Sequence, residues 1–96
     1  MCGIIGINSN KPVSATIINS LKKLEYRGYD SAGIATLSGG LINEIKSEGR
    51  VNNLEKNSLV QSMEGTIGIG HVRWATHGSP NSINAHPHSS QNVSVV

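Results

Sequence analysis

The sequence has one cysteine, no phenylalanine and few charged side chains over its 96 residues. A single cysteine excludes an internal disulfide and fits a reducing compartment. With aromatic residues at only 3%, a hydrophobic core has to be built from Ile, Val, Leu and Ala. The formal net charge of +2 is too small to indicate binding to nucleic acid or to a membrane surface.

Signals for export and membrane insertion are also lacking. No apolar run approaches the length of a membrane span. The opening residues lack the basic segment of a signal peptide and run into a polar stretch at residues 8–11. We therefore expect a cytoplasmic protein with neither a membrane nor a nucleic acid as partner.

The hydrophobic pattern predicts one small α+β domain. Strands are expected at residues 3–7, 32–37, 41–47 and 66–72, with a hairpin turn at residues 38–40. A helix should start near Pro12, in its first turn, and end near Leu24. A weaker helix is expected from residue 51 to residue 63, and its candidate inward positions are Val51, Leu54, Leu59, Val60 and Met63.

Polar residues 73–92 read as a long loop, and residues 93–96 as the start of another strand. A strand that begins so close to the end has no turn after it, whereas domains usually end at the surface. We therefore expect the chain to be a fragment of a longer protein.

Cys2 follows directly on the initiator methionine, and a small side chain at position 2 lets that methionine be removed. Cys2 would then carry a thiol and a free α-amine on one residue. An α-amine titrates close to neutral pH, so it can serve as a general base with little tuning. An N-terminal amine that activates its own nucleophile is one form of covalent catalysis. The structural alternative is a small buried hydrophobe.

Residues 25–33 place both tyrosines in one loop together with Arg27 and Asp30. Arg27 and Asp30 could pair locally, which is the structural interpretation. Arg27 could equally hold a carbonyl group or the N-terminal residue through its rigid fork of donors.

The only tryptophan and all four histidines fall between residues 71 and 88. Arg73 is suited to bind a carboxylate with two hydrogen bonds, and Trp74 beside it is a large flat cover. Thr76 and His77 add further donors and acceptors. A metal site is the rival interpretation, but these histidines lack the i, i+4 helical pair or a nearby cysteine partner, so we expect no metal. A polar surface loop with ordinary histidines stays open.

Residues 1–6, 24–33, 71–78 and 84–88 resemble the class II glutamine amidotransferases, which are N-terminal-nucleophile hydrolases. The most specific part is the string Arg73-Trp74-Ala75-Thr76-His77-Gly78. Within the class, these segments are most similar to the enzymes that aminate fructose-6-phosphate. The phosphoribosylpyrophosphate amidotransferases typically carry Tyr and Ser where this chain has Trp74 and Ala75.

The resemblance implies a fold and a mechanism. The fold is a four-layer α/β/β/α sandwich with two packed antiparallel sheets, of which residues 2–96 would hold an incomplete first part. Cys2 would attack the side-chain amide of glutamine, form a glutamyl thioester and release ammonia, with its own α-amine as the base. The remaining site residues implied by the resemblance are Arg27, which orders the nucleophile; Arg73, which binds the α-carboxylate; Thr76 and His77 beside it; Trp74, which belongs to a closing loop; and His86 nearby.

The resemblance also implies what this chain lacks. In the family a His-Asn-Gly motif that forms the oxyanion hole follows the strand begun at Val93, and a later Asp binds the substrate amine. The isomerase half, which would bind fructose-6-phosphate, is likewise absent, so the fragment alone should be inactive. We expect no cofactor, and a parent protein that is a homo-oligomer. The alternatives are another class II amidotransferase, such as a phosphoribosylpyrophosphate amidotransferase, and a non-catalytic glutamine-binding fragment.

Overall fold

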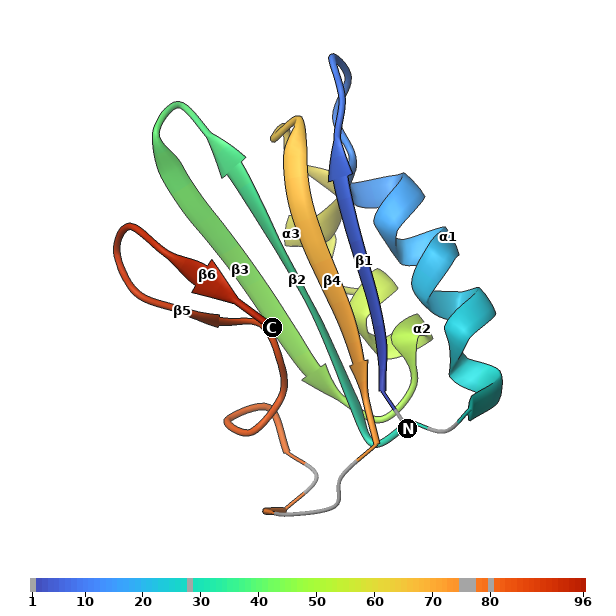
Figure 1. The fold of residues 1–96 in the computed structure, drawn as a ribbon. Coiled ribbons are helices and arrows are strands. Elements are labelled where there is room, and N and C mark those ends of the chain that lie inside the picture. Colours follow the sequence, from blue (N-terminus) through green and yellow to red (C-terminus); the bar gives the residue numbers. More distant parts are fainter. Residues whose placement is uncertain (1, 28, 75–77, 80) are drawn as a thin grey trace.

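A four-stranded antiparallel sheet organises the computed structural model, which describes residues 2–27, 29–74, 78–79 and 81–96, with only the backbone at Arg27 (Figure 1). Its strand order is β1-β4-β2-β3. The strands are β1 (Gly3–Asn8), β2 (Ser31–Ser38), β3 (Leu41–Glu48) and β4 (Ile67–Arg73). A separate antiparallel pair consists of β5 (His88–Ser89) and β6 (Ser94–Val95).

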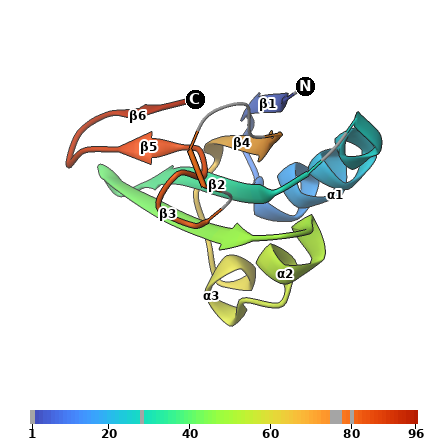
Figure 2. The same cartoon turned by 90° about the horizontal axis from the view of Figure 1, so that it is seen from below.

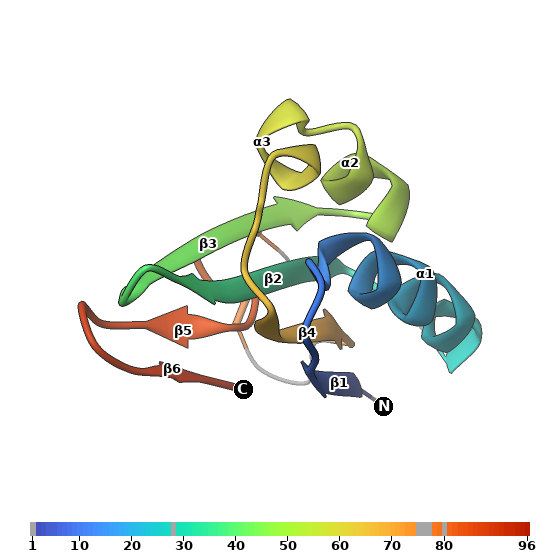
Figure 3. The ribbon, with the colours of Figure 1, turned by 90° about the horizontal axis from the view of Figure 1, so that it is seen from above.

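The helices lie together on one face of the sheet. They are α1 (Ser14–Leu24), the 3₁₀ turn η1 (Glu25–Arg27), α2 (Val51–Glu55) and α3 (Ser58–Gln61). Seen from above, the helices lie on one side of the sheet and the β5–β6 pair on the other (Figure 3). The view from below shows the same layers (Figure 2). The predicted α+β class with antiparallel sheets is confirmed.

The core lies between the sheet and these helices, and the side-chain periodicities explain its composition. In α1 the apolar residues recur every three to four positions, so Ile17, Ile18 and Leu21 share one buried face. In the strands, alternate residues point to the same side, which places Ala32, Ile34 and Val72 opposite that face. As expected, the buried core contains no aromatic side chain among the described residues.

The β2–β3 hairpin forms where the sequence predicts it. Gly39 and Gly40 make its two-residue turn with φ of +58° and +78°. Positive φ at both central positions is the requirement of a type I′ turn, whose twist matches that of the flanking strands. The pairing that follows sets Ile34 opposite Ile45, and both strands extend slightly beyond the predicted bounds.

The predicted helix over residues 51–63 is wrong in two respects. It is two short helices, because the side chain of Asn57 accepts a hydrogen bond from the Leu59 N–H at 3.0 Å and caps a new helix. The restart turns Leu59 outward, 63% exposed, while Val60 is buried. The other inward candidates, Val51, Leu54 and Met63, are buried.

Two other expectations need correction. The first helix begins at Ser14, with Val13 as its N-cap residue, so Pro12 precedes the first turn. The segment after β4 is not a continuous loop, since β5 forms within it and pairs with β6. Within the described part of the chain, no helix has both the length and the hydropathy needed to cross a membrane.

The difference between Leu54 and Leu59 gives a direct test of this packing. Leu54→Ala removes a fully buried side chain and should lower the free energy of unfolding by about 2–5 kcal/mol. The identical change at the exposed Leu59 should stay within about 0.5 kcal/mol of the unmutated protein. Urea unfolding of the two variants measures both values, and equal losses would contradict the observed break at Asn57.

Candidate functional site

Cys2 lies at the end of the sheet where β4 ends. The pairing of β1 with β4 ends at Gly3 opposite Val72, so Cys2 follows directly at the end of the sheet where β4 ends. Its Sγ accepts a hydrogen bond from the Trp74 N–H at 3.5 Å and donates to the Trp74 carbonyl at 3.9 Å. The thiol is therefore held by backbone groups. Because Cys2 is exposed, it is still open to an incoming molecule.

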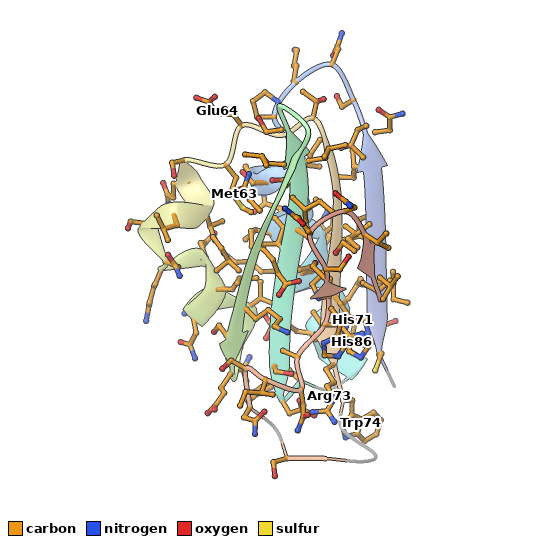
Figure 4. The ribbon with its side chains drawn as sticks, turned by 90° about the vertical axis from the view of Figure 1, so that its left-hand side faces the viewer. Met63, Glu64, His71, Arg73, Trp74 and His86 are labelled. Carbon is orange, nitrogen blue, oxygen red and sulfur yellow. The ribbon has the colours of Figure 1, made fainter. Side chains whose placement is uncertain are left out.

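Trp74, whose backbone contacts this thiol, and Arg73 just before it in the chain differ in exposure. The side chain of Arg73 is only 10% exposed, and its Nη1 donates to the Ser79 carbonyl at 3.0 Å. The same nitrogen lies 3.8 Å from Oδ1 of Asp30. Trp74 is 51% exposed. Figure 4 shows both side chains at the same end of the sheet, near His71 and His86. A guanidinium held at this place can bind an anionic group next to the thiol.

The loop before β2 is tied to the turn after β3. The guanidinium of Arg50 lies 4.4 Å from the centre of the Tyr29 ring, a cation–π contact. Its Nη1 lies 3.8 Å from Oε2 of Glu25. These contacts link Glu25 and Tyr29 to Arg50 in the turn after β3.

Three histidine rings form a stack on the sheet face opposite the helices. His71 and His86 have ring centroids 4.5 Å apart and tilted by 30°, and His86 and His88 are 4.4 Å apart, edge to face. Gly33 of β2 pairs with His71 and permits this arrangement. A Cβ at Gly33 would come within 2.9 Å of Pro87 Cδ and would also collide with the His86 carbonyl. Only glycine therefore lets this segment lie directly on β2.

Burial and neighbouring charge keep the two inner histidines neutral. Burial is the main cause that lowers the pKa of His71 to about 4, helped by His86 and Arg73, with Asp30 opposing and His88 adding slightly. Burial likewise lowers the pKa of His86, followed by His88, Arg73 and Lys46. Both Nδ1 atoms are buried without a hydrogen-bond partner among the described groups. His71 and His86 thus add no second positive charge beside Arg73.

Of the residues predicted for the site, the structure brings together Cys2, Arg73 and Trp74. His86 lies against His71 in the ring stack, and its role towards a substrate stays a prediction. Thr76, His77 and the side chain of Arg27 lie outside the described residues.

Packing explains the glycine that follows Cys2. A Cβ at Gly3 would lie only 2.8 Å from Leu24 Cβ, so a larger residue would collide with α1.

Sequence reasoning missed the partners that hold Arg73. The contact with Asp30 joins the start of β2 to the end of β4, and the Ser79 carbonyl is a backbone group that carries no sequence signal. The sequence pattern distinguishes His71 from the other histidines in one respect. It lies two residues before Arg73 on a strand, and therefore on the same face, which is a signal for its place near the site.

Other places in the described part of the chain offer less chemistry. A cavity of about 430 Å³ lies between β3 and the α3 region, at residues that include Met63 and Glu64, away from Arg73 and Trp74 (Figure 4). Its Glu44 lies 3.6 Å from Lys46. Among the described residues, no three His, Cys, Asp or Glu side chains are grouped so that they could hold a metal ion.

The lowered pKa of His71 predicts a pH-dependent stability. The folded pKa of about 4 lies below the ordinary value of 6.5, so the unfolded chain binds more protons between these values. Stability should be complete above about pH 6.5 and fall by on the order of 3 kcal/mol as the pH drops to about 4. Urea unfolding across this range measures the loss.

His71→Asn should flatten the dependence in that pH window, because the group that differs between folded and unfolded states is gone. His88→Asn, at the exposed end of the stack, is the matched control and should keep most of it. An unchanged pH slope in His71→Asn would contradict the prediction.

The chain resembles known enzymes over its whole length. It is 54% identical over 96 residues to the glutamine–fructose-6-phosphate aminotransferase (isomerizing) of Bradyrhizobium diazoefficiens. The enzymes of that name from Rhizobium meliloti and Brucella abortus are 53% and 54% identical. The chain spans 16% of the length of these curated relatives. No family model matches it.

A solved structure supports the same class of fold. The glutamine phosphoribosylpyrophosphate amidotransferase of B. subtilis, complexed with ADP and GMP, matches with a TM-score of 0.77 and 28% identity. The match covers 96% of this chain and 20% of that one. The chain is thus similar throughout to part of glutamine–fructose-6-phosphate aminotransferase, and its fold is that of a glutamine amidotransferase domain of the N-terminal-nucleophile type.

Proposed function

We propose that this chain is the amino-terminal part of the glutaminase domain of a glutamine–fructose-6-phosphate aminotransferase. The observation that carries the proposal is the 3.5 Å contact between the Trp74 N–H and Cys2 Sγ, which sets the only cysteine against the end of the strand that carries Arg73. The identity of 54% over all 96 residues to an enzyme of that name supports it.

In the proposed reaction the Cys2 thiol attacks the side-chain amide carbon of glutamine. After removal of Met1, the α-amine of Cys2 takes the thiol proton and delivers it to the leaving nitrogen. A C–S bond forms, the C–N bond breaks and ammonia leaves. Water then cleaves the thioester, which yields glutamate and restores the thiol.

In the same proposal, substrate recognition falls to the segment after β4. Arg73 binds the α-carboxylate of glutamine, because its planar fork matches two carboxylate oxygens. Trp74, half exposed beside the thiol, belongs to the cover over the bound substrate. The resemblance further assigns Thr76 and His77 to glutamine binding and Arg27 to the ordering of the nucleophile.

The proposed glutaminase depends on groups outside this chain. By family resemblance, the oxyanion donors, the acid that binds the substrate amine and the isomerase half that binds fructose-6-phosphate belong to the longer protein. Losing even one oxyanion donor costs about 10²–10³ in rate, so residues 2–96 alone should hydrolyse glutamine poorly. We infer that the longer protein acts in the cytoplasm and joins ammonia to fructose-6-phosphate.

A phosphoribosylpyrophosphate amidotransferase is the second candidate, supported by the structural match at 28% identity. The higher identity to the fructose-6-phosphate enzymes and the Trp74-Ala75 pair favour the first. Supplying the longer protein with ammonia and each acceptor in turn separates the two candidates, since only the correct acceptor should be aminated.

Cys2→Ala in the full-length aminotransferase should lower glutamine hydrolysis by roughly 10⁴-fold or more, because the nucleophile is removed. Synthesis from free ammonia should continue, since it does not use the thiol. Steady-state assays with glutamine and with ammonium salts measure both activities. An undiminished hydrolysis of glutamine in this variant would refute the assignment.

An alanine inserted between Met1 and Cys2 is the companion variant. It keeps the thiol but converts the proposed base into an amide, so it should be as damaging as Cys2→Ala. Intact-mass measurement confirms which residue is the N-terminus in each protein.

Arg73→Lys should raise the KM for glutamine by about 10- to 100-fold, because a charged hydrogen bond of about 1.5–3 kcal/mol is lost with the fork while the charge stays. The turnover number should change much less. The α-amide of glutamine, which lacks the carboxylate, is the internal control and should be hydrolysed equally by both proteins. A fall in turnover with KM unmoved contradicts the role.

A further inference from the structure

Asp30 is fixed at the junction where three strands end. Its backbone N–H donates to the Arg73 carbonyl at 2.8 Å, and its own carbonyl accepts from the Gly49 N–H at 2.8 Å. The first contact reaches the end of β4 and the second reaches the turn after β3. The backbone position of Asp30 is therefore set by both neighbouring strands.

The carboxylate of Asp30 extends from this backbone towards the Ser31 hydroxyl and the guanidinium of Arg73. Its Oδ1 accepts a hydrogen bond from the Ser31 hydroxyl at 2.9 Å, and Ser31 is itself fully buried. The side chain of Asp30 is 13% exposed and that of Arg73 is 10% exposed. The 3.8 Å between Oδ1 and Nη1 of Arg73 is too long for a direct hydrogen bond, but the charges attract strongly where so little water screens them.

Arg73 is thereby oriented from two directions. The Ser79 carbonyl accepts from Nη1 at 3.0 Å, and the Asp30 carboxylate faces the same nitrogen. Arginine has a long side chain with many rotamers, and a fork binds a carboxylate well only if its plane is fixed beforehand. Both contacts thus restrict the direction in which the fork points.

We propose that Asp30 is a positioning residue for substrate recognition: it holds the guanidinium of Arg73 in the orientation that accepts the α-carboxylate of glutamine. The inference rests on the proposed glutaminase function. Asp30 itself does not touch the substrate, and its effect passes through Arg73.

A purely electrostatic role for Asp30 would change the KM for glutamine in the opposite direction. If Asp30 acted only as a counter-charge, it would weaken the attraction of Arg73 for an anionic substrate, and its removal would lower the KM for glutamine. If positioning dominates, removal raises that KM. The direction of one measured constant therefore separates the two physical effects.

The test is Asp30→Asn in the full-length aminotransferase, which removes the charge and keeps the shape and an acceptor oxygen. We expect the KM for glutamine to rise about 10-fold, the turnover with glutamine to change less than about threefold, and ammonia-dependent synthesis to stay unchanged. Asp30→Glu, which keeps the charge, should recover part of the loss. A KM that is unchanged or lower in Asp30→Asn overturns the proposal.

Glu48→Gln is the matched control, since it removes a nearby, exposed carboxylate at the end of β3. It should leave the KM for glutamine unaltered. A rise equal to that of Asp30→Asn would assign the effect to general charge and would overturn the proposal.

A double-mutant cycle shows whether Asp30 acts through Arg73. In an Arg73→Lys background, Asp30→Asn should raise the KM much less than 10-fold, because the fork it positions is already gone. An equal rise in both backgrounds overturns the proposal, since the carboxylate would then act on something other than Arg73.

Ser31→Ala decides the matter if Asp30→Asn does not fold. It removes only the hydroxyl that orients Oδ1, and it should raise the KM about threefold with ammonia-dependent synthesis retained; an unchanged KM overturns the proposal. If the unmutated protein fails to hydrolyse glutamine at all, the proposed function itself is wrong, which is a distinct result.

Discussion

The antiparallel pairing of β1 with β4 is the constraint on which the site depends. Gly3 opposite Val72 fixes the register, and with it the place of Cys2 beside Trp74. Successive residues in a strand point to opposite faces, so a slip of one residue would carry the whole pattern of β1 to the wrong side. The buried apolar face against α1 prevents such a slip. Core packing therefore sets the geometry of the thiol.

Charge at this end of the sheet is arranged around one buried guanidinium. Arg73 is compensated by Asp30, which is held by strand-end hydrogen bonds. Burial, together with this positive charge, lowers the pKa of His71 and of His86 and favours their neutral forms. Among the described residues at this strand end, Arg73 is thus a nearly buried cation whose orientation is constrained by neighbouring groups.

The segment around His86 can lie on the face of the sheet opposite the helices because Gly33 has no side chain. Gly33 leaves room for the backbone of His86 and Pro87 to lie on β2, which brings the His86 ring against His71. This contact joins residues far apart in the sequence. It fixes the segment after the site to the strand that carries Arg73.

The sequence by itself determined the strands, the hairpin turn and the first helix, because period, glycine positions and helical spacing act locally. It also predicts the kind of chemistry, through Cys2 and the string that starts at Arg73. Only the tertiary structure decided which groups orient Arg73, why His71 stays neutral and why the helix after β3 breaks at Asn57 with Leu59 outside. Those features rest on backbone carbonyls, burial and contacts between distant strands, and none of these leaves a local pattern in the residues.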